Sequence, residues 1–109
     1  MSDIFEPVGP AHADLLDPAA VVAGCIESDC RSLLLDVESL PPKFFDLSSG
    51  LAGELLHRLS TYGIRLAAVV PDPTRHSESF QDFVREANRG RSFRFSRTRG
   101  EALQWLEEN

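Results

Sequence analysis

The feature that most constrains the fold is the continuous apolar run Ile64–Val70, in which only Arg65 is charged. A second run of this kind, Leu33–Val37, carries its charged residue, Asp36, near its end. Short runs without polar alternation are typical of strands that are covered on both faces, as the strands of a parallel sheet are. We therefore predict two buried, parallel strands in the middle of the chain.

Helical stretches separate these strands from each other and from two shorter strand candidates. Apolar residues recur at helical spacing in residues 18–29, 51–62, 79–90 and 98–107, and short strands are expected at 4–8 and 92–96. Strands that alternate with helices favour a parallel sheet with right-handed crossover connections. The sequence thus predicts a single α/β domain over residues 1–109, with about four mostly parallel strands and about four helices.

Polar residues and glycines mark where the predicted helices begin and end. Gly63 is expected to end the second helix in a left-handed conformation. Ser79 lies three residues before Asp82, which is the spacing of a capping box. Thr98 and Glu101 have the same spacing. We therefore expect Ser79 and Thr98 to begin the third and fourth helices.

The composition disfavours several classes of function. The formal net charge of −6 over 109 residues disfavours binding to nucleic acids or to anionic membranes. No apolar run approaches the length of about 20 residues that spans a membrane, and the N-terminus lacks the pattern of a secretory signal. The protein is therefore expected to be cytoplasmic. Its two cysteines, Cys25 and Cys30, are expected to be reduced, with Cys25 on a buried helix face.

The segment 44–56 contains the strongest candidate for a functional site. Phe44 and Phe45 are expected to end a strand, after which a polar turn and the start of a helix follow. Backbone N–H groups are free at such a turn, and α/β domains usually place their functional surface there. The candidate binding residues of this segment are Asp46, Ser48, Ser49, Gly50 and Glu54.

These residues have structural as well as functional interpretations. Ser49 can cap the free N–H groups of a helix start, or it can be a phosphorylation site that adds charge and bulk to the surface. Asp46 can cap the turn with its side chain. Alternatively, carboxylates converge on one rim to hold Mg²⁺ or to act in acid–base catalysis; they are Asp36, Asp46, Glu54 and Asp72. Because the chain carries none of the common catalytic motifs, no enzymatic activity, metal or cofactor is predicted.

A second candidate lies at the end of the third helix, where Glu86, Asn88 and Arg89 precede Gly90. One interpretation is that these residues end the helix, with Asn88 or Gly90 in the left-handed conformation. The other is that Glu86 and Arg89 form a polar lock against the turn at Asp46.

Arginines at 89, 91, 94, 97 and 99 form a basic cluster around the last predicted strand. Phe93 and Phe95 fall on one face of that strand and Arg94 on the other, as in a half-buried strand whose edge is protected by solvated arginines. Aromatic residues interleaved with arginines superficially suggest RNA stacking, but the half-buried strand is the preferred interpretation and no nucleic-acid partner is predicted. A surface for an anion or an acidic partner is the alternative.

Short sequence motifs of this chain resemble those of two known families. The turn Ser48-Ser49-Gly50-Leu51, with the order of elements over about 17–107, resembles the STAS domain (sulphate transporter and anti-sigma factor antagonist). The words FFDL, GLAGE and EANRG, at 44–47, 50–54 and 86–90, resemble an uncharacterised bacterial domain family of unknown function. In anti-sigma factor antagonists a partner kinase phosphorylates the serine before the glycine. The STAS resemblance therefore implies a phosphorylation switch at Ser49.

The sequence predicts a non-enzymatic regulatory or protein-interaction module with a STAS-like fold, which binds its partner through residues 46–54. The resemblance implies an anti-sigma-type kinase as the partner. The alternative is a small-molecule or anion sensor that uses the same helix N-terminus, with nearby arginines as ligand groups. An exposed edge strand also allows a homodimer.

Overall fold

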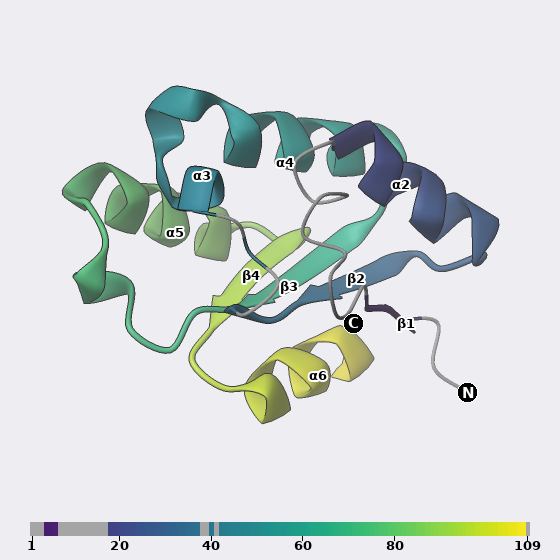
Figure 1. Cartoon of the computed structure of the whole chain (residues 1–109). Coiled ribbons are helices and arrows are strands. Elements are labelled where there is room, and N and C mark those ends of the chain that lie inside the picture. The colour runs from purple at the N-terminus through teal and green to yellow at the C-terminus, as the bar shows by residue number, and fades with distance from the viewer. Residues whose placement is uncertain (1–3, 7–17, 38–39, 41, 109) are drawn as a thin grey trace.

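The computed structural model describes residues 4–6, 18–37, 40 and 42–108, and its centre is a four-stranded sheet (Figure 1). The strands are β1 (Ile4–Phe5), β2 (Ser32–Leu35), β3 (Arg65–Val69) and β4 (Phe93–Ser96). They lie in the order β1-β2-β3-β4, and every neighbouring pair is parallel. The predicted α/β class and the parallel sheet are thus confirmed. Of the first predicted strand, residues 7 and 8 lie outside the described residues.

Five α-helices and two short 3₁₀ turns occur among the described residues. They are α2 (Pro18–Glu27), α3 (Pro42–Phe45), η2 (Leu47–Ser49), α4 (Leu51–Thr61), η3 (Pro73–Arg75), α5 (Glu78–Arg89) and α6 (Arg99–Glu108). Helices α2, α4 and α5 connect successive parallel strands and lie together on one face of the sheet, whereas α6 lies on the other (Figure 1). Right-handed crossovers between strands in sequential order place their helices on the same face. Helix α6 follows the last strand, so the crossover rule does not place it.

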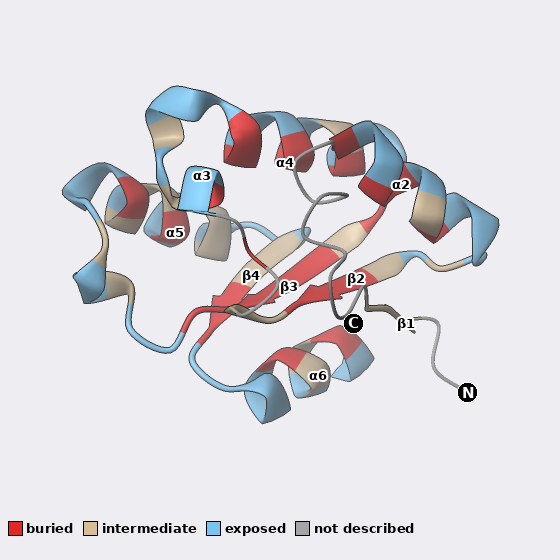
Figure 2. Cartoon of the chain, in the orientation of Figure 1, coloured by how far each residue is buried: buried red, intermediate tan, exposed pale blue. Residues whose placement is uncertain are grey.

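Two groups of buried residues correspond to the two faces (Figure 2). The larger group fills the space between the sheet and the layer of α2, α4 and α5, with Leu33, Leu66 and Phe80 fully buried in it. The smaller group lies between the sheet and α6 and contains Leu34 and Leu106. Strands β2 and β3 are therefore covered on both faces, which is why their sequences are continuously apolar.

The predicted strand end at Phe44–Phe45 and the predicted start of the third helix are wrong. Phe44 and Phe45 end the short helix α3 rather than a strand. Pro42 is the first residue of that helix, where its fixed φ angle and missing N–H favour a helix start. Helix α5 begins with Ser77 as its N-cap, not with Ser79. The extended backbone of Ser77 lets its Oγ accept a hydrogen bond from the N–H of Phe80 at 3.1 Å.

The other predicted helix ends are mostly confirmed. Gly63 has a φ angle of 68° and ends α4 in the left-handed conformation. Thr98 Oγ1 accepts a hydrogen bond from the N–H of Glu101 at 3.1 Å, as an N-cap does. The left-handed conformation expected for Asn88 or Gly90 is wrong, because Asn88 is helical and Gly90 is extended with a φ of −88° and a ψ of −175°.

Among the described residues, no helix combines the length and the apolar character that crossing a membrane requires.

Candidate functional site

The predicted turn forms an exposed corner, residues 46–50, between α3 and α4. Asp46 caps the 3₁₀ turn η2, because its Oδ1 accepts hydrogen bonds from the N–H of Ser48 at 3.1 Å and from the hydroxyl of Ser48 at 2.6 Å. Gly50 has a φ angle of 79°, which a residue with a side chain adopts only with strain. The conformation of the corner is thus stabilised by the Asp46 side chain and requires a glycine at position 50.

Ser49 connects the two sides of the corner through its hydroxyl group. Its Oγ lies 2.7 Å from the carbonyl oxygen of Lys43 and 2.7 Å from that of Asp46. The same oxygen accepts a hydrogen bond from the N–H of Leu51, the first residue of α4, at 3.3 Å. The structure therefore gives Ser49 the capping geometry, while its side chain remains at the surface.

The two phenylalanines that directly precede the corner belong to an aromatic cluster. Phe44 is 1% exposed and contacts Phe80 and Phe95, with ring centroids 6.1 and 6.3 Å apart. The neighbouring Phe45 stacks on His76, with centroids 4.1 Å apart and rings within 4° of parallel. The residues before the corner are therefore packed into the core, and Phe45 connects them to the loop that contains His76.

The carboxylates of the predicted rim have local partners and do not form a metal site among the described residues. Asp72 caps η3 through Thr74, and the hydrogen bond from the Thr74 hydroxyl is the main reason why the pKa of Asp72 is lowered. Asp36 accepts a hydrogen bond from the N–H of Val37 at 2.7 Å, and Glu54 pairs with Arg58 at 3.1 Å. No group of three or more potential metal ligands occurs in the part of the chain that the structure describes.

The second predicted group, at the end of α5, lies away from the corner. Phe80, in the first turn of α5, contacts Phe45, whereas Glu86 and Arg89 lie in the last turns of the helix. Glu86 and Arg89 pair with each other at 3.6 Å and are both more than three-quarters exposed. The polar lock proposed against Asp46 is therefore not formed.

Asn88 has a role that the sequence did not reveal. Its Oδ1 accepts a hydrogen bond from the N–H of Phe95 at 2.8 Å, and its Nδ2 donates to the carbonyl oxygen of Phe95 at 3.3 Å. The carbonyl groups of Ser92 and Ser96 accept hydrogen bonds from β3. Backbone polar groups of successive residues in a strand point to opposite sides. Those of Phe95 therefore point away from β3, to the open edge of the sheet. The amide of Asn88 thus occupies this edge as a neighbouring strand would.

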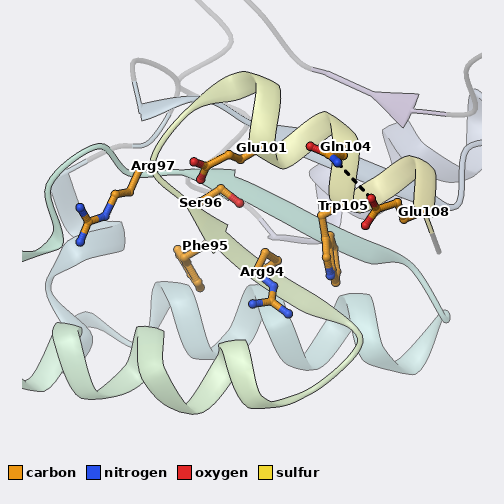
Figure 3. Close-up of a pocket in the computed structure, with 8 residues that line it drawn as sticks. All are labelled: Arg94, Phe95, Ser96, Arg97, Glu101, Gln104, Trp105 and Glu108. Carbon is orange, nitrogen blue, oxygen red and sulfur yellow. Dashed lines mark hydrogen bonds between the residues drawn. The ribbon is translucent and has the colours of Figure 1, made fainter.

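A groove of about 610 Å³, which no sequence pattern predicted, lies between β4 and α6 (Figure 3). Arg94 and Ser96 line it from β4, and Glu101, Gln104 and Trp105 line it from α6. Arg94 is half-buried with its guanidinium beside the ring of Trp105, 5.7 Å from the centroid, and its Nε is buried without a hydrogen-bond partner among the described residues. Its placement on the face opposite Phe95 is confirmed, but its interpretation as a solvated edge residue is wrong because Trp105 covers it.

A second arginine lies beside the same tryptophan. Arg65 has its guanidinium 4.4 Å from the centroid of the Trp105 ring and donates hydrogen bonds to the carbonyl oxygens of Trp105 and Leu106, both at 3.3 Å. Burial lowers the pKa of Arg65. No signal in the sequence joins residues 65, 94 and 105, because only the packing of α6 brings them together.

Comparison with known proteins identifies a family for this fold. The model of the family described as "Domain of unknown function (DUF4180)" matches residues 10–106. A search of the curated proteins gave no match, and a search of the solved structures gave none.

Proposed function

The chain belongs to the DUF4180 family, a domain of unknown function, and we propose that it is a non-enzymatic regulatory module that binds a protein partner through the corner 46–50 and the start of α4. The observation that carries this proposal is that Asp46, Ser48 and Ser49 are all exposed and yet held by local hydrogen bonds. A turn that is already ordered loses little conformational entropy on binding. The corner is therefore suited to be recognised as a rigid shape.

Phosphorylation of Ser49 is the regulatory step that we propose for this surface. The Ser49 hydroxyl contacts the carbonyl oxygens of Lys43 and Asp46. A phosphate would remove the hydroxyl donor and add a charge of about −2 next to these oxygens and to the Asp46 carboxylate. The modified corner would rearrange, so a partner that recognises its shape would be released. A STAS-like relationship, with an anti-sigma-type kinase as the modifying enzyme, belongs to this proposal.

The binding surface can be tested by capture from lysate of the source cells with matched variants of the full chain. Ser48→Arg adds bulk and charge at an exposed position of the corner. Glu107→Gln changes an exposed position of α6, on the opposite face of the sheet, and is the control. We expect proteins bound by the wild type to bind Ser48→Arg about tenfold less or worse, and to bind Glu107→Gln unchanged. Equal capture by all three chains would overturn the proposal, provided that Ser48→Arg retains the thermal melt of the wild type.

The phosphorylation step has a separate test. Mass spectrometry of protein isolated from its own cells, in growth and in starvation, is expected to find a phosphorylated fraction at Ser49. A chain that is unmodified at this position in every condition would remove the switch and leave the docking surface to be judged by the capture experiment.

A second candidate function, an anion or small-molecule sensor, is favoured by Arg94, which lines the β4–α6 groove and whose Nε has no hydrogen-bond partner in the part of the chain that the structure describes. Its site would be the groove rather than the start of α4, because Arg94, Ser96 and the Trp105 ring together offer charge, a hydroxyl and an aromatic surface. A thermal-shift screen of phosphate, nucleotides and organic anions tests it. The expected result is a rise in Tm for the wild type that Arg94→Met abolishes, and no rise with any anion excludes the sensor.

A further inference from the structure

The two cysteines of the chain lie on either side of the C-terminal end of α2. Cys25 belongs to the last turns of the helix and is fully buried, and Cys30 follows the helix end and is half-buried. Both are free thiols in the structure. The chain contains no other cysteine, so any disulfide within one molecule must join these two.

The backbone at the end of α2 brings the two cysteines together. The N–H of Cys30 donates to the carbonyl oxygen of Cys25 at 2.8 Å, and the N–H of Asp29 donates to that of Ile26 at 3.0 Å. Asp29, between them, has a left-handed φ angle of 56°. This is the Schellman arrangement of a helix end, in which the side chains at the positions of Cys25 and Cys30 commonly touch.

The hydrogen bond also limits the distance between the two Cα atoms. An amide nitrogen lies about 1.46 Å from its own Cα, and a carbonyl oxygen lies about 2.4 Å from its own Cα. With a hydrogen bond of 2.8 Å between Cys30 and Cys25, the two Cα atoms are at most about 6.7 Å apart. Disulfides typically join Cα atoms about 4.4–6.8 Å apart. The backbone therefore keeps the two Cα atoms within the upper limit of the separation that a disulfide bridges.

The two cysteines also line the same small hollow. Both line a small hollow of about 170 Å³ between the C-terminal ends of α2 and α4, together with Ile26 and Tyr62. Burial is the main reason why the pKa of Cys25 is raised to about 11, and a charge on Cys30 adds to the rise. Cys30 is half-buried whereas Cys25 is 0% exposed, so Cys30 is the thiol that a reagent meets first.

We propose that Cys25 and Cys30 form a modification site at which a hydroperoxide produces a disulfide within one molecule. This inference does not depend on the proposed function of the corner. The bond would close across the hollow and change the surface that Ile26 and Tyr62 present, which are 54% and 57% exposed.

The reaction proceeds in two steps. The thiolate of Cys30 attacks one oxygen of the hydroperoxide, an S–O bond forms as the O–O bond breaks, and the leaving oxygen takes a proton. The thiol of Cys25 then loses its proton and its sulfur attacks the sulfur of Cys30, so that the S–S bond forms, the S–O bond breaks and water leaves. The two thiols lose two electrons in all, and the hydroperoxide gains them.

Intact-mass spectrometry of the reduced full chain, treated with a small excess of hydrogen peroxide, tests the proposal. We expect a loss of the mass of two hydrogen atoms, no thiol that N-ethylmaleimide can alkylate, and full recovery of both thiols with dithiothreitol. The Cys25→Ser chain is expected instead to form a sulfenic acid on Cys30 that dimedone traps. Cys30→Ser is expected to leave Cys25 reduced under the same treatment, since the first reacting thiol is gone.

Three results would overturn the proposal. They are retention of both alkylatable thiols in the treated wild type, a disulfide-linked dimer in place of the monomeric species, and oxidation of Cys30 to a sulfinic acid while Cys25 stays reduced. Because the decisive measurement uses the wild-type chain, it does not depend on how well either variant folds.

Discussion

The two faces of the sheet are covered by different kinds of contact. Among the described residues, nineteen buried residues form the group under α2, α4 and α5, whereas five form the group under α6. The first face is filled by aliphatic and aromatic side chains. On the second, the half-buried arginines Arg65 and Arg94 lie against Trp105. Their long apolar stems cover the sheet while their charged ends reach carbonyl groups, a tryptophan ring or a groove.

This difference implies that the two faces contribute unequally to the stability of the fold. Apolar burial contributes free energy in proportion to the buried area, so the larger group supplies most of the stability. Beside the smaller group, the Nε atoms of Arg65 and Arg94 are buried without hydrogen bonds among the described residues. Burying such atoms costs free energy. We expect the α6 face to tolerate substitution better, and four experiments test this comparison.

The largest effect is expected for Phe80→Ala. Phe80 is fully buried and contacts Phe44, Phe45, Phe83 and Phe95. Its removal should lower the free energy of unfolding by about 3–5 kcal/mol, as measured by urea denaturation. Leu59→Ala in α4 and Leu106→Ala in α6 remove the same side chain on the two faces, and should cost about 3–5 and about 2–3 kcal/mol, respectively. An equal or larger loss for Leu106→Ala would mean that the two faces do not differ in the way described.

Asn88→Ala is expected to cost about 1–3 kcal/mol, because it leaves the N–H and the carbonyl group of Phe95 without their partner. Asn88→Asp retains the acceptor for the N–H and loses only the donor, so its loss should be smaller. Hydrogen exchange at the amide of Phe95 measures the edge directly and should become faster in Asn88→Ala. An unchanged exchange rate would contradict the role assigned to Asn88.

The two arginines of the α6 face should respond in opposite ways. Arg65→Met removes two hydrogen bonds to the end of α6 and should cost about 1–2 kcal/mol. Arg94→Met removes a buried Nε that has no partner among the described residues and should change stability by less than about 0.5 kcal/mol, or raise it. Both are measured by thermal and urea melts. A loss for Arg94→Met as large as for Arg65→Met would show that Arg94 is held by more than its ring contact.

The smallest effect is expected for the ion pair between Glu6, which follows β1, and Arg99, at the start of α6. The hydrogen bond from Arg99 lowers the pKa of Glu6 below its ordinary value of 4.5. A lowered pKa in the folded state contributes stability that is present above the ordinary value and is lost as the pH falls through the folded value. Glu6→Gln should therefore cost less than about 1 kcal/mol at neutral pH, and the difference from the wild type should vanish in acid. A difference that stays constant with pH would argue that the pair contributes nothing electrostatic.

The sequence was sufficient to predict elements whose pattern is local. The apolar runs at Leu33–Val37 and Ile64–Val70 predicted β2 and β3, and Gly63 predicted the end of α4. The errors occurred where two local signals compete. Ser77 and Ser79 can each cap the start of α5, and only the path of the chain through η3 selects Ser77.

The candidate site was predictable only in part, for the same reason. The turn at Asp46–Gly50 is local, so the capping of Ser48 by Asp46 could be anticipated. The role of Asn88 depends on a strand that begins five residues later and folds back against it. The contact of Arg94 with Trp105 depends on which face of the sheet α6 covers. The spacing of residues along the chain predicts neither the contact of Asn88 nor that of Arg94.

The position of α6 after all four strands has a consequence for biosynthesis. Domains are made from the N-terminus, and the layer of α2, α4 and α5 can form on its face of the sheet while translation continues. The opposite face, with Leu34, Ala67 and Val69, gains its cover only when residues 99–108 have left the ribosome. A nascent chain that has completed β4 therefore carries an apolar surface on a sheet that is otherwise assembled, until α6 covers it.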